Sequence, residues 1–223
     1  MANENEVAVV AQENQIENVP QQIQPQNLLT MWNDTELFNK TFKMAKFLAD
    51  STLVPQAYKG NVGNCVIAID LANRSGMSPM VVMQNTQVVQ GNLTWKGSAC
   101  KAMIDGCGRY EQSEYVEFGE RGKPTWGYYL QAIEKKTGKL VKGTAVTWDM
   151  VVGEGWHSKS GSKWKTMPEQ MFKYRAATFF ARTQCPEVLM GFMTADEVVD
   201  VKGDDTEQKQ VISLSMNKGG END

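Results

Sequence analysis

Basic and aromatic side chains are concentrated in one short stretch of the sequence, residues 156–165. Its Gly and Ser content predicts a loop, and this loop carries Lys159, Lys163 and Lys165. Two tryptophans lie within the same ten positions. Since cations neutralise phosphates and flat rings stack on bases, this combination is typical of a surface that binds single-stranded nucleic acid.

The segment that follows predicts a helix with two arginines on one face. It begins at Pro168 with Glu in the first turn, and its apolar residues recur at helical spacing. Arg175 and Arg182 are seven residues apart, so they lie one above the other, about 10 Å apart along the axis. Two such cations could follow the phosphates of one extended strand. The alternative interpretation is a solvated charged face opposite an apolar one.

The formal net charge of −3 hides an uneven distribution along the chain. Residues 1–36 contain six acidic residues and no Lys or Arg. Residues 194–223 contain eight acidic residues and three Lys, so the central 157 residues hold 20 basic and 12 acidic side chains. A basic centre between acidic ends indicates nucleic-acid binding, although acidic tails also occur merely for solubility.

The sequence contains little that would support catalysis. His157 is the only histidine, and the four cysteines form no CxxC pair, so no zinc site of ordinary spacing can be drawn. There is neither a GxxxxGK[ST] phosphate loop nor a closely spaced carboxylate motif for a metal. We therefore expect a binding protein that is not an enzyme, although a nuclease built from scattered acids stays open.

Nothing in the sequence predicts membrane insertion or export. No apolar run approaches the ~20 residues of a membrane span, and the N-terminus lacks the pattern of a signal peptide. Cysteines without a pairing pattern fit a reducing compartment. We expect a cytoplasmic protein with no membrane partner.

The order of apolar patterns predicts an α+β fold: a compact core of helices packed on a small antiparallel sheet with hairpins, between disordered acidic termini. Residues 1–32 are polar and lack hydrophobic periodicity, which predicts a disordered arm. Residues 201–223 predict a disordered acidic tail for the same reason. The predicted domain is residues 33–200.

The first predicted helix follows a cap at residues 33–36 and is amphipathic. Phe38, Phe42 and Phe47 belong to its apolar pattern, and we expect them in the core. Contact between protomers through the same phenylalanines is the alternative. A second helix is predicted over residues 62–74, closed by Ser and Gly.

The middle of the chain predicts β-structure around one further helix. Residues 80–90 are rich in β-branched residues and predict a strand, which a Gly-Asn turn connects to residues 93–95. Residues 96–98 are expected to open a helix that runs to about residue 106. Residues 113–148 contain alternating aromatic segments separated by two Gly-containing loops, which predicts a three-stranded antiparallel meander.

Two long segments, residues 51–95 and 155–200, resemble the RecT family of phage single-strand annealing proteins. The second contains the pattern W-x-x-x-P-x-x-M-x-x-x-R-A-x-x-x-x-x-R, which begins at Trp164 and matches in order and register. With the predicted sheet between them, the resemblance covers roughly residues 40–200. It implies a compact α+β core of the kind shared distantly with the lambda Red beta protein.

The resemblance also implies an activity and partners. These are ATP-independent annealing of complementary single strands in DNA recombination, and assembly into rings or helical filaments. No cofactor is implied, with Mg²⁺ at most favouring annealing. The implied partners are single-stranded DNA, the annealed duplex intermediate, a phage 5′–3′ exonuclease and the single-stranded-DNA-binding protein of a bacterial host cell. A passive protector of single strands, without annealing activity, is the alternative.

Carried over residue by residue, Arg175 and Arg182 stand where the family has cations that bind the DNA backbone. Trp164 and Pro168 resemble its structural anchors, and the hairpin at residues 84–96 resembles a wall of its groove. We expect no catalytic and no metal-binding residue. The candidate DNA-binding residues are Arg175, Arg182, Lys159, Lys163, Lys165, Lys173, Gln84, Asn85, Trp95, Lys96 and Lys101.

Overall fold

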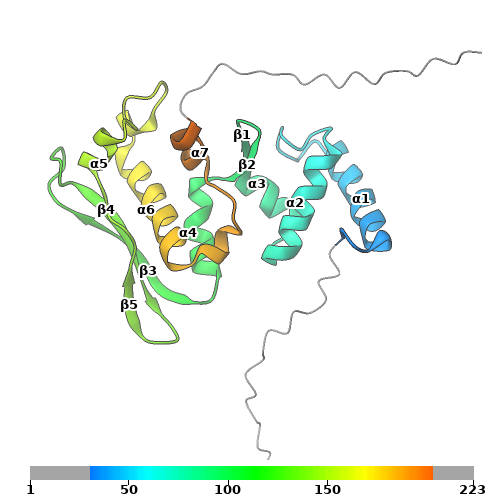
Figure 1. Cartoon of the computed structure of the whole chain (residues 1–223), viewed down its shortest axis with the longest axis horizontal. Coiled ribbons are helices and arrows are strands. Elements are labelled where there is room, and N and C mark those ends of the chain that lie inside the picture. Colours follow the sequence, from blue (N-terminus) through cyan, green and yellow to red (C-terminus); the bar gives the residue numbers. More distant parts are fainter. Residues whose placement is uncertain (1–30, 203–223) are drawn as a thin grey trace, which may run out of the picture.

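An antiparallel sheet lies at one end of the computed structural model, which describes residues 31–202 (Figure 1). β3 (Tyr110–Phe118), β4 (Gly127–Glu134) and β5 (Lys139–Lys142) follow one another in the sheet and in the sequence. β6 (Val146–Thr147) pairs with the first residues of β4. The predicted three-stranded meander is confirmed, and one short strand is added to it.

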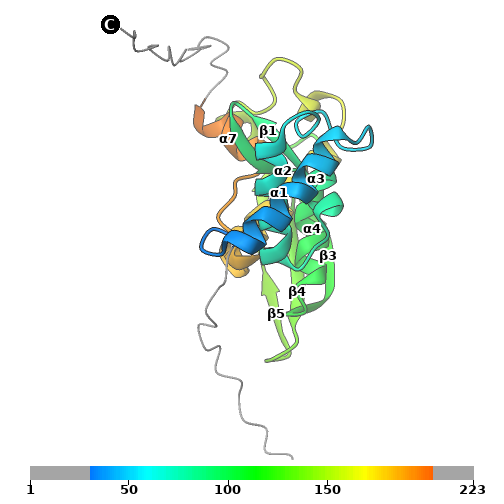
Figure 2. The same cartoon turned by 90° about the vertical axis from the view of Figure 1, so that its right-hand side faces the viewer.

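The residues of β4 alternate between the two faces of this sheet. Leu130 and Ala132 are fully buried, whereas Tyr129 on the other face is half-buried. α4 (Gly97–Gly106) and α6 (Pro168–Gln184) cover the buried face (Figure 1), and the turned view in Figure 2 shows α4 next to β3. The predicted α+β class is therefore present, with helices on one face of the sheet.

Three helices form the other end of the protein: α1 (Thr35–Asp50), α2 (Val62–Ser75) and α3 (Pro79–Asn85) (Figure 1). Asp34 caps α1, because its side chain accepts the amide N–H three residues later at 2.9 Å. Gly76 ends α2 in the left-handed conformation, with φ of 68°. The first two helices are confirmed with the boundaries that their caps predict.

Residues 80–90 are not one strand, contrary to the prediction. α3 takes the first part, and only β1 (Thr86–Val89) pairs with β2 (Asn92–Trp95) as a hairpin. Ser78 accounts for the difference, because its side chain caps α3 and the following proline suits the first helical position. The capping signal outweighs the β-propensity of the valines. The helix also buries the side chain of Val82 fully.

Three large apolar side chains of α1, those of Phe42, Met44 and Phe47, are exposed, whereas Leu37 and Leu48 of the same helix pack against the core. Phe42 is 37% exposed and Phe47 is 75% exposed, whereas the buried residues of α1 are small: Thr41, Ala45 and Ala49. Small residues let α1 approach α2 closely. The predicted burial of Phe42 and Phe47 is wrong, because the apolar pattern alone does not tell which stripe of a helix meets its neighbour.

The described residues extend slightly beyond the predicted domain. Met31 is 3% exposed, and the ring of Trp32 lies 6.4 Å from that of Phe38. At the other end α7 (Ala195–Lys202) is helical, although no helix was predicted for these residues from the sequence. The remaining predictions of a disordered arm and tail concern residues that lie outside the described part of the chain.

A cluster of aromatic rings joins the sheet to the C-terminal half of the chain. Phe172 of α6 is fully buried at its centre, with its ring 4.9 Å from those of Trp126 and Trp164. Trp156 stacks on Trp164 at 5.7 Å. These contacts fix the loop that follows α5 (Trp148–Gly153) against α6.

Substitution of Gly127 tests the close pairing of β4 with β6, because a Cβ at this position would collide with the carbonyl oxygen of Val146. Gly127→Ala should lower the free energy of unfolding by about 2–3 kcal/mol, since the two backbones would have to separate. Gly153→Ala is the matched control: a Cβ there meets nothing within 4 Å. Because Ala favours helix, the control should be neutral or stabilising by up to ~1 kcal/mol. Urea denaturation measures both variants, and a Gly127→Ala protein as stable as the wild type would contradict this pairing.

Candidate nucleic-acid interface

Arg175 lies inside the protein rather than on an exposed helix face. Its side chain is 5% exposed, and its Nη2 donates to a carboxylate oxygen of Asp200 at 2.5 Å. The carbon of its guanidinium group lies 4.0 Å from the centre of the Trp156 ring. A buried guanidinium is costly without a counter-charge, so the carboxylate and the ring compensate it.

Arg182 is held by another carboxylate of α7. Its Nε and Nη2 each donate to Glu197 at 2.8 Å, and Nη2 also donates to the carbonyl oxygen of Phe192 at 2.8 Å. Glu197 also accepts the backbone N–H of Thr194 at 2.6 Å, which is the bond that the Glu of a capping box makes back to the cap residue, and the Thr194 hydroxyl at 3.0 Å. Burial opposes ionisation of Glu197, but these hydrogen bonds outweigh it and lower the pKa of its carboxyl.

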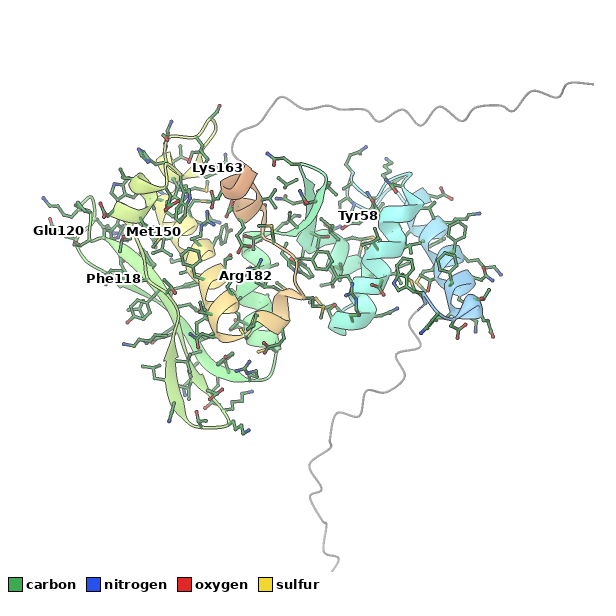
Figure 3. The ribbon with its side chains drawn as sticks, viewed as in Figure 1. Tyr58, Phe118, Glu120, Met150, Lys163 and Arg182 are labelled. Carbon is green, nitrogen blue, oxygen red and sulfur yellow. The ribbon has the colours of Figure 1, made fainter. Side chains whose placement is uncertain are left out.

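The prediction of two arginines exposed on one helix face is therefore wrong in this structure. The two arginines do lie on the same face of α6, because both bind carboxylates of α7. That face is covered by α7; Arg182 is labelled in Figure 3. The sequence-based prediction was wrong because it did not include α7. Its signal in the sequence is the T-x-x-E pattern that ends at Glu197, with Asp200 three residues further along the same helix face.

The lysines of the loop differ in their surroundings. Lys159 is 24% exposed, and its Nζ lies 2.9 Å from Asp200, which therefore bridges Lys159 and Arg175. Lys163 and Lys165 flank the buried Trp164, so both point outward and are exposed. Figure 3 labels Lys163 close to α7. Within residues 31–202 neither of these two lysines forms an ion pair.

A cavity of about 290 Å³ lies between this loop and α7. Its lining combines cations, an indole ring and acids, and includes Lys159, Lys163, Arg175, Trp156, Asp196 and Asp200. A second cavity of about 350 Å³ shares Trp156, Arg175 and Asp200 with the first, and Glu197 is among its lining residues. The first cavity thus brings together three of the predicted cations, two from the loop and one from α6.

The candidate residues of the hairpin do not join this cavity. Trp95 is fully buried, and its indole N–H donates to the carbonyl oxygen of Leu189 at 3.1 Å, so it cannot stack on a base. Lys96 donates to the carbonyl oxygen of Gln84 at 2.6 Å. The side-chain amide of Asn85 donates to a backbone carbonyl within α3. The assignment of Trp95 to a DNA groove is wrong here, because the hairpin packs its ring into the core.

Lys101 and Lys173 also lie elsewhere. Lys101 pairs with Asp105 at 2.6 Å on α4. Lys173 pairs with Glu169 at 2.9 Å and lines a different cavity, about 550 Å³, beside Arg121. The side chain of Arg121 is 63% exposed. It was not among the candidate DNA-binding residues, because in the sequence it resembles any cation in a hairpin loop.

The described residues contain no cluster of three or more His, Cys, Asp or Glu side chains that could hold a metal ion. Burial raises the pKa of Cys100 to about 11, so its thiol stays protonated near neutral pH. Within the same residues no helix combines the length and the apolar character that crossing a membrane requires. The lining of the cavity between the loop and α7 offers the cations of Lys159, Lys163 and Arg175 and the indole ring of Trp156.

Arg175→Ala would leave Asp200 and Trp156 without their partner and open a gap beside the ring. We expect it to lower the free energy of unfolding by about 2–4 kcal/mol. Lys163→Ala removes the same charge from an exposed position and should change it by no more than about 0.5 kcal/mol. Urea denaturation of the two variants in parallel checks the difference. Equal effects would show that Arg175 is not buried in this way.

Comparison with known proteins finds no relative of this chain. No family model, no curated protein and no solved structure matches the chain. The features of the described residues that bear on function are the cavity beside α7 and the exposed lysines of the loop.

Proposed function

We propose that this chain binds single-stranded DNA and anneals complementary strands without ATP in phage DNA recombination. The observation that carries the proposal is the cavity beside α7, where Lys159, Lys163 and Arg175 gather next to Trp156. Cations beside an indole ring are the components of a groove for a single strand. The RecT-like pattern that begins at Trp164 supports the same function.

In this proposal the strand first meets Lys163 and Lys165, because these cations are exposed and lack an internal counter-ion within the described residues. Neutralised phosphates repel a second strand less strongly, and that repulsion is the main obstacle to pairing. Base pairing then supplies both the free energy and the sequence information. The protein consequently needs neither ATP nor a base-specific contact, and Mg²⁺ would only favour annealing further.

The active form in this proposal is an oligomer, a ring or a helical filament. One protomer contacts only a few nucleotides, whereas annealing has to test many, so adjacent protomers would extend the groove. α1 and its flanking segments expose a set of large apolar side chains: Trp32, Phe42, Met44, Phe47 and Leu53. Exposed apolar surface of this kind supports a contact between protein subunits.

The further partners in the proposal come from the RecT-like pattern alone. A phage 5′–3′ exonuclease would produce the single strand, and the single-stranded-DNA-binding protein of the host would cover it before annealing. The annealed duplex is held briefly as the product. In this proposal the protein acts in the cytoplasm of a bacterial host cell.

The direct test measures the annealing rate of two complementary fluorescent oligonucleotides, with and without the protein and without ATP. A denaturing gel checks strand length in the presence of Mg²⁺. Strong acceleration with intact strands is the expected result. Tight binding without acceleration would favour a passive protector, and shortened strands would indicate a nuclease.

The loop lysines provide the first mutational prediction for this function. Replacing Lys163 and Lys165 together by Ala should weaken binding to every single-stranded sequence. It should also reduce the log–log salt slope by about 1.4, because each phosphate contact contributes about 0.7. The matched control replaces Lys135 and Lys136 in the exposed β4–β5 turn by Ala and should leave the slope unchanged. Fluorescence anisotropy over a salt series measures both, and equal slopes for both variants would argue against the loop.

The exposed phenylalanines provide a second prediction. Replacing Phe42 and Phe47 together by Ser should raise the dissociation constant of self-association at least about tenfold, because both rings would leave the contact. Leu140→Ser is the control, since Leu140 is 53% exposed on β5, at the opposite end of the protein. Analytical ultracentrifugation measures the association of each variant. If the phenylalanine variant associates like the wild type, α1 is not the contact.

A further inference from the structure

Arg175 has a buried donor without a partner. Its Nη2 donates to Asp200, whereas its Nε makes no hydrogen bond within the described residues, although the side chain is 5% exposed. A guanidinium group presents Nε and one Nη side by side, and this fork matches two oxygens of one anion. Asp200 instead gives one carboxylate oxygen to Arg175 and the other to Lys159. Half of the fork is therefore unused.

We propose that Arg175 and Lys159 form a phosphate-binding site that Asp200 occupies in the free protein. This inference rests on the proposed function and concerns how its site is regulated. A phosphodiester group has two unbridged oxygens that can accept both donors of the Arg175 fork while one of them also contacts Lys159. Asp200 is then an internal anion that the strand displaces, and we refer to the contact of Asp200 with Arg175 and Lys159 as the latch.

Only the last turn of α7 has to move for this exchange. The first turn is anchored, because Glu197 binds Arg182 and the backbone of Thr194, and because Val198 is 1% exposed. The last turn is held by the latch and by a 3.4 Å contact from Lys159 to the carbonyl oxygen of Val199. The anchor and the latch are therefore separate parts of one short helix.

Negative charges are crowded at the latch. Asp196 lines the same cavity as Asp200, and burial together with the charges of Asp200 and Glu197 raises the pKa of its carboxyl above the ordinary value. Repulsion among these acids weakens the docking of the last turn. A phosphate that displaces Asp200 from the cavity relieves part of this repulsion.

The experiment compares Asp200→Asn with Glu197→Gln, two changes that each remove one carboxylate charge from α7 at nearly constant size. Asp200→Asn should bind a thymidine homopolymer about tenfold more tightly than the wild type at about 0.1 M salt. Glu197→Gln should not bind more tightly, because Glu197 belongs to the anchor. Fluorescence anisotropy measures affinity, and urea denaturation confirms that both variants are folded.

Hydrogen exchange provides a second readout on the unmodified chain. Adding the thymidine homopolymer should accelerate exchange in the last turn of α7, residues 199–202, and leave α6 unchanged. Acceleration is specific to displacement of the turn, whereas a strand that binds over a docked α7 would slow exchange there.

The outcomes separate the latch from the function on which it depends. If the wild type binds DNA but Asp200→Asn binds no more tightly, or if exchange in the last turn slows, the latch is overturned and DNA binding stands. If Asp200→Asn binds the thymidine homopolymer whereas the wild type and Glu197→Gln do not, the latch is supported. If the wild type and both variants fail to bind, the proposed function is overturned, and the inference with it.

Discussion

The charge of Arg175 has to be compensated inside the protein, and this constraint arranges much of the C-terminal half of the chain. A guanidinium group that is 5% exposed requires an anion, and Asp200 of α7 supplies it. The ring of Trp156 covers the group from the loop. Because the three partners come from α6, α7 and the loop, this buried ion pair ties the last turn of α7 and the loop to α6.

The aromatic cluster around Phe172 supports the same region from the side of the sheet. Trp126 contacts Phe172 from the segment just before β4, and Trp164 contacts it from the loop, so the loop is held at a defined distance from the strands. Gly127 allows β6 to approach β4 closely enough to continue this layer. The aromatic contacts therefore hold the loop against α6, whereas Lys163 and Lys165 on either side of Trp164 are exposed.

The candidate site was partly predictable from the sequence. The crowding of lysine and tryptophan in residues 156–165 located the cavity, because neighbours in the sequence stay neighbours in a short loop. The pairing of Arg175 with Asp200 was not predictable from spacing, since the two residues are 25 positions apart. The resemblance assigned Trp95 to the wall of a groove, yet its indole N–H donates to the carbonyl oxygen of Leu189, 94 positions away in the chain.

The sequence by itself determined most elements of this protein, because caps and turns act over a few residues. Asp34 begins α1, Gly76 ends α2 and Pro168 opens α6, each as a local signal predicts. Only the tertiary structure decided which side chains are exposed, because exposure depends on segments that are distant in the sequence. Phe47 points outward since small residues face α2, and the two arginines of α6 are covered since α7 returns across them.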